Sequence, residues 1–296
     1  VRYCKEQQID VIVDHSGSPY TRFVHIYAAR RLKKVRFLLY LHANAYYSAD
    51  KGIKEWVYAR LLRSAARHSA KIVAISHSVA ESYLRRYHLP KDKMQVVYNG
   101  TDLHRFIPHP AHTDTPLRLI YVGRIFRDKG IDLLLEALAA CPTDTPITLT
   151  LVGSDHGGYT EQMQALAARL HLEDKVQFLG SRTDVPQLLQ AADLFVHPAT
   201  CQEGFGITLI EAMASGVPCL AFPKGAIPEI IGPEIDGFLT EEVSAAALTA
   251  GINRALELFT KAPHHWHTLC KNARQKAELF SIERTVAQLE ALYQEQ

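Results

Sequence analysis

The chain has 296 residues, 47% of them hydrophobic and 22% charged, a composition that excludes a disordered or collagen-like chain. At roughly 150 residues per domain, this length predicts about two domains. Residues 1–116 carry 19 Lys and Arg against 9 Asp and Glu, a balance of +10, whereas the rest carries 14 against 22, a balance of −8. The two parts are therefore expected to bind different partners, and the positive charge of the basic part is expected to attract phosphates, anionic lipid or nucleic acid.

The apolar stretches and the cysteines narrow the class of protein further. No uninterrupted apolar stretch approaches the roughly 20 residues that a membrane helix needs. The five cysteines are odd in number and form no C-x-x-C pair, so neither a disulfide framework nor a zinc site is expected, and a reducing cytosol is favoured. No signal peptide is recognisable. Because the chain begins with Val rather than Met, its natural start is expected to lie further upstream.

Short β-branched runs alternate with helical patterns along the whole chain, which predicts parallel sheets of the α/β class. The expected strands comprise residues 9–13, 36–41, 71–75, 94–98, 118–122, 147–152, 176–179, 194–197 and 218–221. The clearest helical patterns comprise residues 54–68, 130–140 and 160–170. Several strands are apolar at consecutive positions, which is typical of strands covered on both faces.

A proline-rich polar segment marks the expected boundary between the two domains. Pro108, Pro110 and Pro116 bracket the sequence HPAHTDTP, just before a strand that opens a second α/β series. The charge balance also changes sign there. We therefore predict an N-terminal domain over residues 1–112, a C-terminal domain over 113–278 and a C-terminal helix over 279–296.

The most informative segment begins at Glu203, after the strand over 194–197. The glycines of this segment allow a sharp turn. A helix is predicted over 205–215, and the free backbone N–H groups at the start of this helix could bind a phosphate. Glu203 lies beside that end and Glu211 about two turns further on, so two carboxylates could reach different parts of one ligand. The alternative is that Glu203 caps the helix and Glu211 forms a surface ion pair.

Three shorter features follow other strands. Arg124 and Lys129 lie in a strand-to-helix loop flanked by Gly123 and Gly130, where two cations could hold a diphosphate, unless the loop is only a solvated turn. His42 ends an apolar strand, where a lone histidine is also compatible with a structural role. Residues 99–100 form an Asn-Gly pair, which is first of all a turn signal.

Together these features resemble glycosyltransferase family 4, a family of retaining enzymes with two Rossmann-like domains facing across a cleft (GT-B). The resemblance rests on the Gly-Arg-x4-Lys-Gly loop, the Glu-x7-Glu pair, the Asn-Gly turn, the strand-end histidine and the ending over 280–293. It implies an α/β fold whose C-terminal helix crosses back onto the first domain. It also implies a strand and a glycine-rich loop ahead of Ile9; neither is visible, so the N-terminal domain is expected to be incomplete at its start.

The resemblance also implies roles for individual residues. Glu203 and His42 would be the catalytic residues, with Glu203 on the sugar hydroxyls and His42 near the reaction centre. Arg124 and Lys129 would grip the donor diphosphate, and Glu211 would bind the ribose. The donor-binding set implied in this way comprises Gly123, Arg124, Lys129, Ser154, Arg182, Phe205, Gly206, Ile207 and Glu211.

The implied activity is metal-independent transfer of a hexose, with retention, from a UDP- or GDP-linked sugar to a glycan, lipid or polysaccharide acceptor. No Asp-x-Asp motif is present, and no cofactor or metal is expected. The alternatives are a non-catalytic carbohydrate- or nucleotide-binding partner subunit and a nucleotide-sugar epimerase of the same fold. The expected location is the cytoplasm, with peripheral contact between the basic N-terminal domain and the anionic inner face of the membrane, and no nucleic-acid partner.

Overall fold

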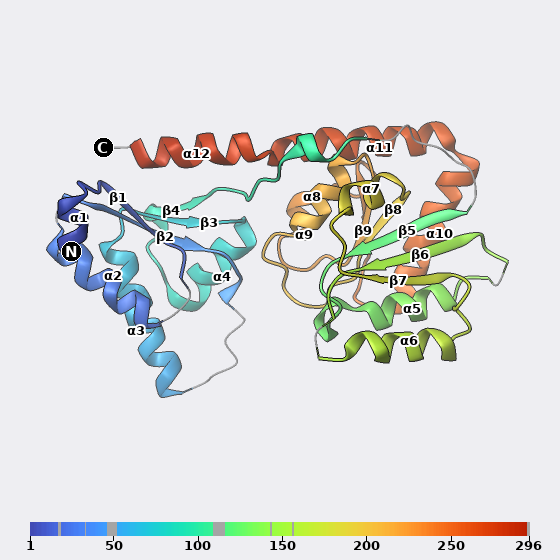
Figure 1. Cartoon of the computed structure of the whole chain (residues 1–296), viewed down its shortest axis with the longest axis horizontal. Coiled ribbons are helices and arrows are strands. Elements are labelled where there is room, and N and C mark those ends of the chain that lie inside the picture. The colour runs from blue at the N-terminus through green and yellow to red at the C-terminus, as the bar shows by residue number, and fades with distance from the viewer. Residues whose placement is uncertain are drawn as a thin grey trace. The chain divides into compact units, whose positions relative to one another are not determined.

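The computed structural model describes residues 1–16, 19–32, 34–45, 52–108, 116–142, 144–155 and 157–294. The chain forms two compact units (Figure 1). Unit 1 comprises Val1–Asn99, Glu203–Phe205 and Thr285–Gln296, and unit 2 comprises Gly100–Gln202 and Gly206–Arg284. Of the linker predicted between Pro108 and Pro116, residues 109–115 lie outside the described residues, and the domain limits given above stay a prediction.

Unit 1 is built on one parallel sheet of the order β1-β2-β3-β4. Its elements are α1 (Arg2–Glu6), β1 (Val11–Asp14), α2 (Pro19–Arg31), β2 (Arg36–Leu41), α3 (Ile53–His68), β3 (Lys71–Ala74), α4 (His77–Tyr87), the 3-10 turn Lys91–Lys93 and β4 (Met94–Val96). Strand β2 is buried from Phe37 to Leu41, as its unbroken apolar run predicts. Helix α12 (Ile282–Gln294) joins unit 1 from Thr285 on, where the Thr285 hydroxyl donates to the Tyr98 carbonyl at 2.9 Å.

Unit 2 holds a second parallel sheet, of the order β10-β9-β8-β5-β6-β7. Its strands are β5 (Leu117–Val122), β6 (Ile147–Val152), β7 (Val176–Gly180), β8 (Leu194–His197), β9 (Cys219–Ala221) and β10 (Gly237–Leu239). Its helices are α5 (Ile131–Ala139), α6 (Tyr159–Arg169), α7 (Val185–Gln190), α8 (Ile207–Ala214), α9 (Ile227–Ile230), α10 (Ala245–Lys261) and α11 (Pro263–Ala277), with 3-10 turns at Leu103–Arg105, Arg127–Lys129 and Glu278–Phe280.

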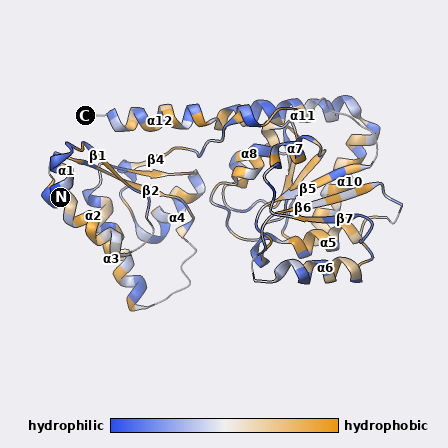
Figure 2. Cartoon of the chain, viewed as in Figure 1, coloured by the Kyte–Doolittle hydropathy of each residue, from blue (hydrophilic) through white to orange (hydrophobic). Residues whose placement is uncertain are grey.

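Helices cover both faces of the unit 2 sheet. Helices α5 and α6 run side by side along one face, and α7 and α8 lie on the other (Figure 1). The strands are predominantly apolar in Figure 2, and their side chains form the core together with those of α5, α10 and α11. Trp266 of α11 is 1% exposed and meets the ring of Phe259 edge-on at 5.4 Å. The predicted fold class, two Rossmann-like parallel α/β units, is confirmed.

Most predicted strands agree with the structure within two residues, and two local predictions need correction. Strand β10, a three-residue edge strand beside β9, was not predicted. The helix predicted to start at Phe205 starts at Ile207, because Gly206 adopts a left-handed conformation (φ 93°) and separates Phe205 from the helix. Within the described part of the chain, every helix is too short or too polar to span a bilayer. All five cysteines are free thiols.

Candidate functional site

The loops that follow β5, β6 and β8 pack together at the carboxyl edge of the unit 2 sheet. The Gly123 N–H donates to the Val152 carbonyl and the Ile125 N–H to the Ser154 carbonyl, each at 2.9 Å, which joins the first two loops. The Thr200 N–H donates to the Asp128 carbonyl at 3.0 Å and joins the third. Open α/β sheets bind ligands at this edge.

Two glycines allow these loops to approach one another so closely. A Cβ at Gly130 (φ +65°) would lie 2.0 Å from the Pro198 carbonyl oxygen. A Cβ at Gly153 (φ +154°) would lie 1.7 Å from the Gly123 carbonyl oxygen. Any side chain at either position would clash with the facing carbonyl and push the loops apart. The positive φ of both residues also favours glycine.

The predicted cations of the diphosphate site lie in the first of these loops. Arg124 is exposed, and its carbonyl accepts a hydrogen bond from the Tyr121 hydroxyl at 2.8 Å, which anchors the loop to the buried end of β5. Lys129 is half-buried, and its Nζ lies 3.9 Å from the Cys201 sulfur, in the loop after β8. The structure thus holds Gly123, Arg124, Lys129 and Ser154 within one group of joined loops.

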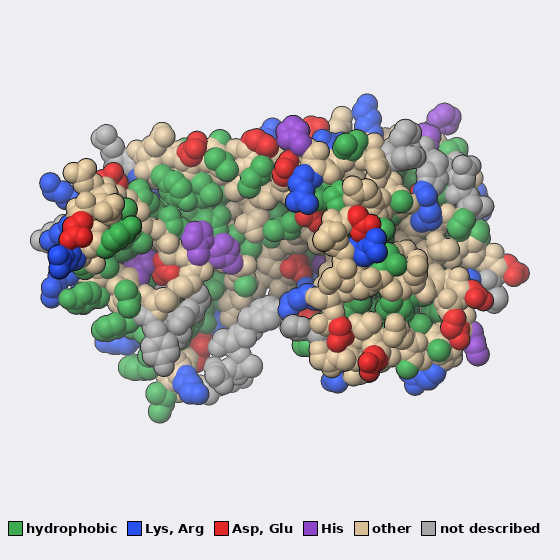
Figure 3. Space-filling view, viewed as in Figure 1, with side chains coloured by type: hydrophobic (Ala, Val, Ile, Leu, Met, Phe, Trp, Pro, Cys, Tyr) green, Lys and Arg blue, Asp and Glu red, His purple; other side chains and the backbone are tan. Residues whose placement is uncertain are grey.

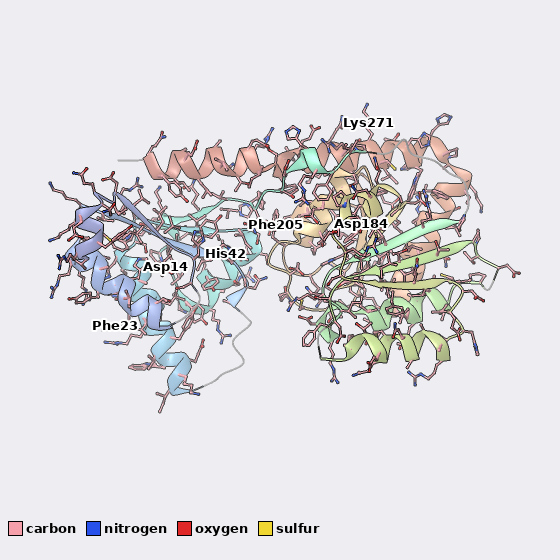
Figure 4. All side chains as sticks on the ribbon, viewed as in Figure 1. Asp14, Phe23, His42, Asp184, Phe205 and Lys271 are labelled. Atoms are coloured by element: carbon pink, nitrogen blue, oxygen red, sulfur yellow. The ribbon has the colours of Figure 1, made fainter. Side chains whose placement is uncertain are left out.

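Arg182 forms an ion pair with an acidic neighbour. Its Nη2 and Nε lie 2.6 and 2.8 Å from the two carboxylate oxygens of Asp184, which is labelled in Figure 4. The pair raises the pKa of Arg182 and lowers that of Asp184, although both groups lie at the surface. A donor contact by Arg182 would therefore share its guanidinium group with Asp184.

Helix α8 supplies the next predicted residues. Gly206 is its N-cap and no described side chain caps its start, while the first helical residue, Ile207, is 42% exposed. Glu211 follows one turn later, on the same face of the helix as Ile207. Burial raises the pKa of Glu211, and the positive charge of Arg105 partly opposes that shift. The carboxyl group thus lies in a low-polarity environment close to the start of α8.

In unit 1, His42 lies at the carboxyl end of β2 and is labelled in Figure 4. Its Nε2 lies 2.8 Å from Nδ1 of His15, which follows the neighbouring strand β1. Its ring also stacks on Tyr40, with centroids 4.6 Å apart and planes 20° apart. Burial lowers the pKa of His42, and His15 lowers it further. Both effects favour the neutral form of the His42 imidazole.

The loop that carries His15 is held by a buried polar cluster. The Asp14 carboxylate lies 2.8 Å from the His25 Nδ1 and accepts hydrogen bonds from the Ser16 N–H at 2.9 Å and the Ser16 hydroxyl at 2.6 Å. The side chains of Asp14 and His25 are only 8% and 4% exposed. No motif in the sequence predicted a role for these residues. The available signal was His15 itself, since it lies two residues after the strand predicted over 9–13, whose carboxyl end lies beside that of the next strand.

The segment Glu203–Phe205 belongs to unit 1 by its contacts. The Asn44 amide donates to the Glu203 carbonyl at 3.3 Å, and the Ser76 hydroxyl donates to the Gly204 carbonyl at 2.8 Å. A Cβ at Gly204 would lie 3.2 Å from the His42 carbonyl oxygen, so the two backbones are in contact. The two predicted catalytic residues, His42 and Glu203, therefore lie on segments that pack directly against each other.

Phe205 has an evident packing role at the end of this segment. Its side chain is 3% exposed, and its ring centroid lies 5.7 Å from that of Tyr98. The predicted donor contact of Phe205 stays a prediction. Overall, the predicted residues fall into two groups. Unit 1 holds His42, Glu203 and Phe205, and unit 2 holds Gly123, Arg124, Lys129, Ser154, Arg182, Gly206, Ile207 and Glu211. Among the described residues, no three His, Cys, Asp or Glu side chains are grouped to hold a metal ion.

Comparison with known families gives two matches that together cover most of the chain. Residues 105–276 match the model of the family described as Glycosyl transferases group 1. Residues 1–105 match the model of Glycosyltransferase Family 4. The first match alone covers more than half of the chain.

Two similar proteins of assigned activity show how far the likeness extends. Over 98% of its length, the chain is 26% identical to the N-acetyl-alpha-D-glucosaminyl L-malate synthase of Bacillus anthracis. Over 76% of its length, it is 30% identical to the D-inositol 3-phosphate glycosyltransferase of Salinispora tropica. The chain spans 75% of the length of the first of these relatives and 51% of the second.

Solved structures share the fold. Anabaena HepE in complex with UDP superposes with a TM-score of 0.84 at 24% identity, covering 98% of this chain and 79% of HepE. The sucrose-phosphate synthase of Thermosynechococcus elongatus superposes with a TM-score of 0.80 at 27% identity, covering 99% of this chain and 75% of the synthase.

Proposed function

The chain belongs to the Glycosyl transferases group 1 family, and on that premise we propose that it transfers a hexose from a nucleotide-diphosphate sugar to a carbohydrate or lipid acceptor. The observation that carries this proposal is the joined group of loops in unit 2, which holds Arg124 and Lys129 in a single loop at one sheet edge. A UDP- or GDP-linked donor fits such a group. Anabaena HepE has been crystallised with UDP-glucose, which supports a uridine nucleotide as the first candidate.

The proposed donor site binds the diphosphate through electrostatic interactions. Guanidinium and ammonium groups form strong, charge-assisted hydrogen bonds with phosphate oxygens. The start of α8 adds N–H groups and the positive end of a helix dipole. As the bond to the sugar breaks, negative charge grows on the departing diphosphate, and fixed cations and dipoles stabilise it without a metal ion. Metal-independent transfer follows as part of the proposal.

The proposed sugar-side groups are His42 and Glu203. A neutral imidazole can donate or accept a hydrogen bond without bringing a positive charge close to a sugar that becomes cationic in the transition state. Glu203 would orient the sugar hydroxyls and offset that developing charge. Retention is proposed to follow from attack on the face that the diphosphate leaves, with a phosphate oxygen taking the acceptor proton. No covalent intermediate with Glu203 is needed.

For the acceptor, we propose a glycan, a lipid-linked glycan or a polysaccharide. Among the relatives, the mannosyltransferase LpsB of Rhizobium meliloti is named for lipopolysaccharide core biosynthesis and is 28% identical over 67% of this chain. A cytoplasmic location is part of the same proposal, and the five free thiols are compatible with it.

The test is a donor panel of UDP- and GDP-linked hexoses, with release of the nucleoside diphosphate as the readout. NMR of the product's anomeric proton then reports whether configuration is retained. Release of UDP or GDP with a retained anomer supports the proposal. An inverted product overturns retention. Conversion of the donor sugar without nucleotide release assigns an epimerase, and nucleotide binding without turnover of any donor assigns a binding subunit.

A further inference from the structure

His15 and His42 place two imidazole rings at the carboxyl edge of the unit 1 sheet, where strands β1 and β2 end. Both side chains are exposed, and Figure 3 shows histidine side chains grouped on the surface where Figure 4 labels His42. The ring nitrogens that face each other, His15 Nδ1 and His42 Nε2, form a hydrogen bond of 2.8 Å. The outer nitrogens, His15 Nε2 and His42 Nδ1, have no hydrogen-bond partner among the described residues. They are therefore open to a ligand.

The two rings are fixed by their neighbours before any ligand binds. The Tyr40 ring lies against both, with its centroid 4.7 Å from that of His15 and 4.6 Å from that of His42, and Tyr40 itself is 4% exposed. The turn that carries His15 is closed by Asp14, whose carboxylate accepts a hydrogen bond from the Ser16 N–H at 2.9 Å. Rings held in this way lose little rotational freedom on binding, which favours affinity for a ligand.

The hydrogen bond between the rings couples their outer nitrogens. A neutral imidazole carries one proton, on either Nδ1 or Nε2. If the facing nitrogen of one ring donates, the outer nitrogen of that ring is an acceptor, and the other ring carries its own proton on its outer nitrogen. The outer pair therefore offers one donor and one acceptor in either arrangement. The neutral state is favoured, because burial and the neighbouring His15 both lower the pKa of His42.

We propose that His15 Nε2 and His42 Nδ1 together bind hydroxyl groups of the acceptor sugar, so that His15 is an acceptor-binding residue. A hydroxyl group both donates and accepts hydrogen bonds, so hydroxyl groups satisfy one donor and one acceptor. The two ring centroids lie 5.1 Å apart, a separation that two hydroxyl groups of one hexose ring can span. This role of His15 depends on the proposed transferase function, in which a hydroxyl group of the acceptor attacks the transferred sugar.

The proton count of the pair argues against an anionic group as its ligand. Phosphate and an ionised carboxylate mainly accept hydrogen bonds, so the outer nitrogen without a proton would face the anion with nothing to donate. A polar atom left unsatisfied in this way is costly. The acceptor is favoured over the donor because His42 is the residue proposed to lie near the reaction centre. The hydroxyl group that meets His42 Nδ1 is then the attacking one, and His15 binds a second hydroxyl group of the same sugar.

NMR of the imidazole nitrogens tests the site directly. The isotope-labelled full chain is titrated with methyl α-D-glucopyranoside and with methyl α-D-mannopyranoside. Before the titration, long-range proton–nitrogen spectra should show one protonated and one unprotonated outer nitrogen. At least one of the glycosides should shift the ring nitrogens of His15 and His42 together, while those of His25, whose side chain is 4% exposed, should stay unchanged. Methyl phosphate should bind the pair more weakly than the glycoside.

Two variants of His15 separate direct contact with the acceptor from support of His42. Alanine and glutamine both remove the outer nitrogen, but glutamine can keep the hydrogen bond to His42. His15→Ala and His15→Gln should therefore both raise KM for the glycoside acceptor about fivefold, which corresponds to the loss of one hydrogen bond. Of the two, His15→Gln should retain most of the turnover at saturating acceptor. KM for the nucleotide sugar should be unchanged in both variants.

His68→Gln is the matched control for these variants. His68 is an exposed histidine of unit 1 at the end of α3, and it lies just before β3 begins, at the opposite edge of the sheet from His15 and His42. The control should leave both KM values unchanged. Thermal melting is measured on every variant, so that a loss of folding is separated from a loss of the acceptor contact.

Several results would overturn the proposal. They are an unchanged acceptor KM in both His15 variants, a rise in KM for the nucleotide sugar instead, no shift of either ring with the glycosides, and tighter binding of methyl phosphate than of the glycosides. Turnover with an unchanged acceptor KM in the variants would remove this role of His15 and leave the proposed function standing. Glycoside binding at the two rings without turnover of any donor would keep the hydroxyl site and contradict the proposed function.

Discussion

His15 Nδ1 and His42 Nε2 lie 2.8 Å apart, although 27 residues separate them in the sequence. The contact exists because β1 and β2 are adjacent parallel strands and each histidine follows the end of one of them. Both rings also lie within 5 Å of the Tyr40 ring, centroid to centroid. One proton between His15 Nδ1 and His42 Nε2 forms a hydrogen bond that satisfies both nitrogens. This hydrogen bond orients the His42 ring and disfavours a positive charge on it.

The first prediction concerns this pair. Replacing His15 with Ala should raise the pKa of His42, because the repulsion from His15 disappears while burial still lowers that pKa. The acid limb of the activity profile should then move to higher pH, since His42 gains its proton earlier. Turnover should fall about fivefold, which corresponds to the loss of one hydrogen bond that contributes about 1 kcal/mol. NMR titration of the His42 ring and the pH profile of turnover provide the measurement.

His15→Gln is the matched variant for this prediction. Glutamine can keep a hydrogen bond to His42 without bringing a charge, so it should raise the pKa of His42 but restore most of the turnover at high pH. An unchanged His42 pKa in both variants would show that His15 only fills space. Affinity for the bare nucleotide should stay the same, which separates positioning from general damage to the protein.

The second prediction concerns the diphosphate loop. Replacing Arg124 or Lys129 with Ala should weaken binding of a nucleoside diphosphate by about 1.5–3 kcal/mol, the range for hydrogen bonds to charged groups. Calorimetric titration measures it. Arg127→Ala is the control, because this exposed arginine lies in the same loop but outside the proposed site. Equal effects in all three variants would mean that only the net charge of the loop matters.

The third prediction separates the two glutamates. Glu211→Ala should weaken the bare nucleoside diphosphate, because its proposed contact is with the ribose. Glu203→Ala should leave that affinity nearly unchanged and lower turnover, because its proposed contacts are with the sugar and strengthen in the transition state. The dissociation constant and the turnover number are measured for each variant, with melting as the check on folding. Equal loss of nucleotide affinity in both, with turnover unaffected, would contradict this assignment.

The pH dependence of nucleotide binding follows from the same assignment. Burial raises the pKa of Glu211, so the carboxylate takes up its proton at a higher pH than an ordinary glutamate does. Affinity should therefore fall as the pH is lowered through that raised pKa, and Arg105→Ala should move the fall to still higher pH, because the Arg105 charge favours the ionised form. In Glu211→Gln this pH dependence should be absent.

The fourth prediction tests the close approach at Gly130. Gly130→Ala should lower the melting temperature and weaken nucleotide binding, because the new methyl group would lie 2.0 Å from the Pro198 carbonyl oxygen. Gly180→Ala is a matched control, since Gly180 has the same φ of +65° and no atom within 4 Å of the added Cβ. The control should show only the conformational cost of roughly 1–2 kcal/mol and unchanged nucleotide affinity. Identical melting and binding in the two variants would rule out a steric role.

The fifth prediction is metal independence. Donor binding and turnover should persist in excess chelator, because Arg124, Lys129 and the start of α8 are proposed to neutralise the diphosphate. Turnover with and without EDTA is compared, followed by addition of Mg²⁺ or Mn²⁺. Loss of turnover in chelator that either ion restores would contradict the prediction.

The sequence by itself determined the class of fold and the position of each loop along the chain. Buried strands such as β2 and β8 follow from local apolar runs, and their alternation with helices favours a parallel arrangement. Because ligand-binding loops of such sheets follow the strands, the sequence also predicted where Arg124, Lys129 and Ser154 would lie. These features depend on neighbours within a few residues, which is why a pattern could reveal them.

The tertiary structure alone decided which distant groups meet. The His15–His42 contact depends on β1 and β2 being neighbours in the sheet, and the packing of Gly204 on His42 joins segments about 160 residues apart. Likewise, six large apolar side chains of α2 and α3, among them Trp56, are exposed rather than buried in a core. No periodicity encodes such contacts, because each depends on strand order and packing in space and not on the spacing of residues along the chain.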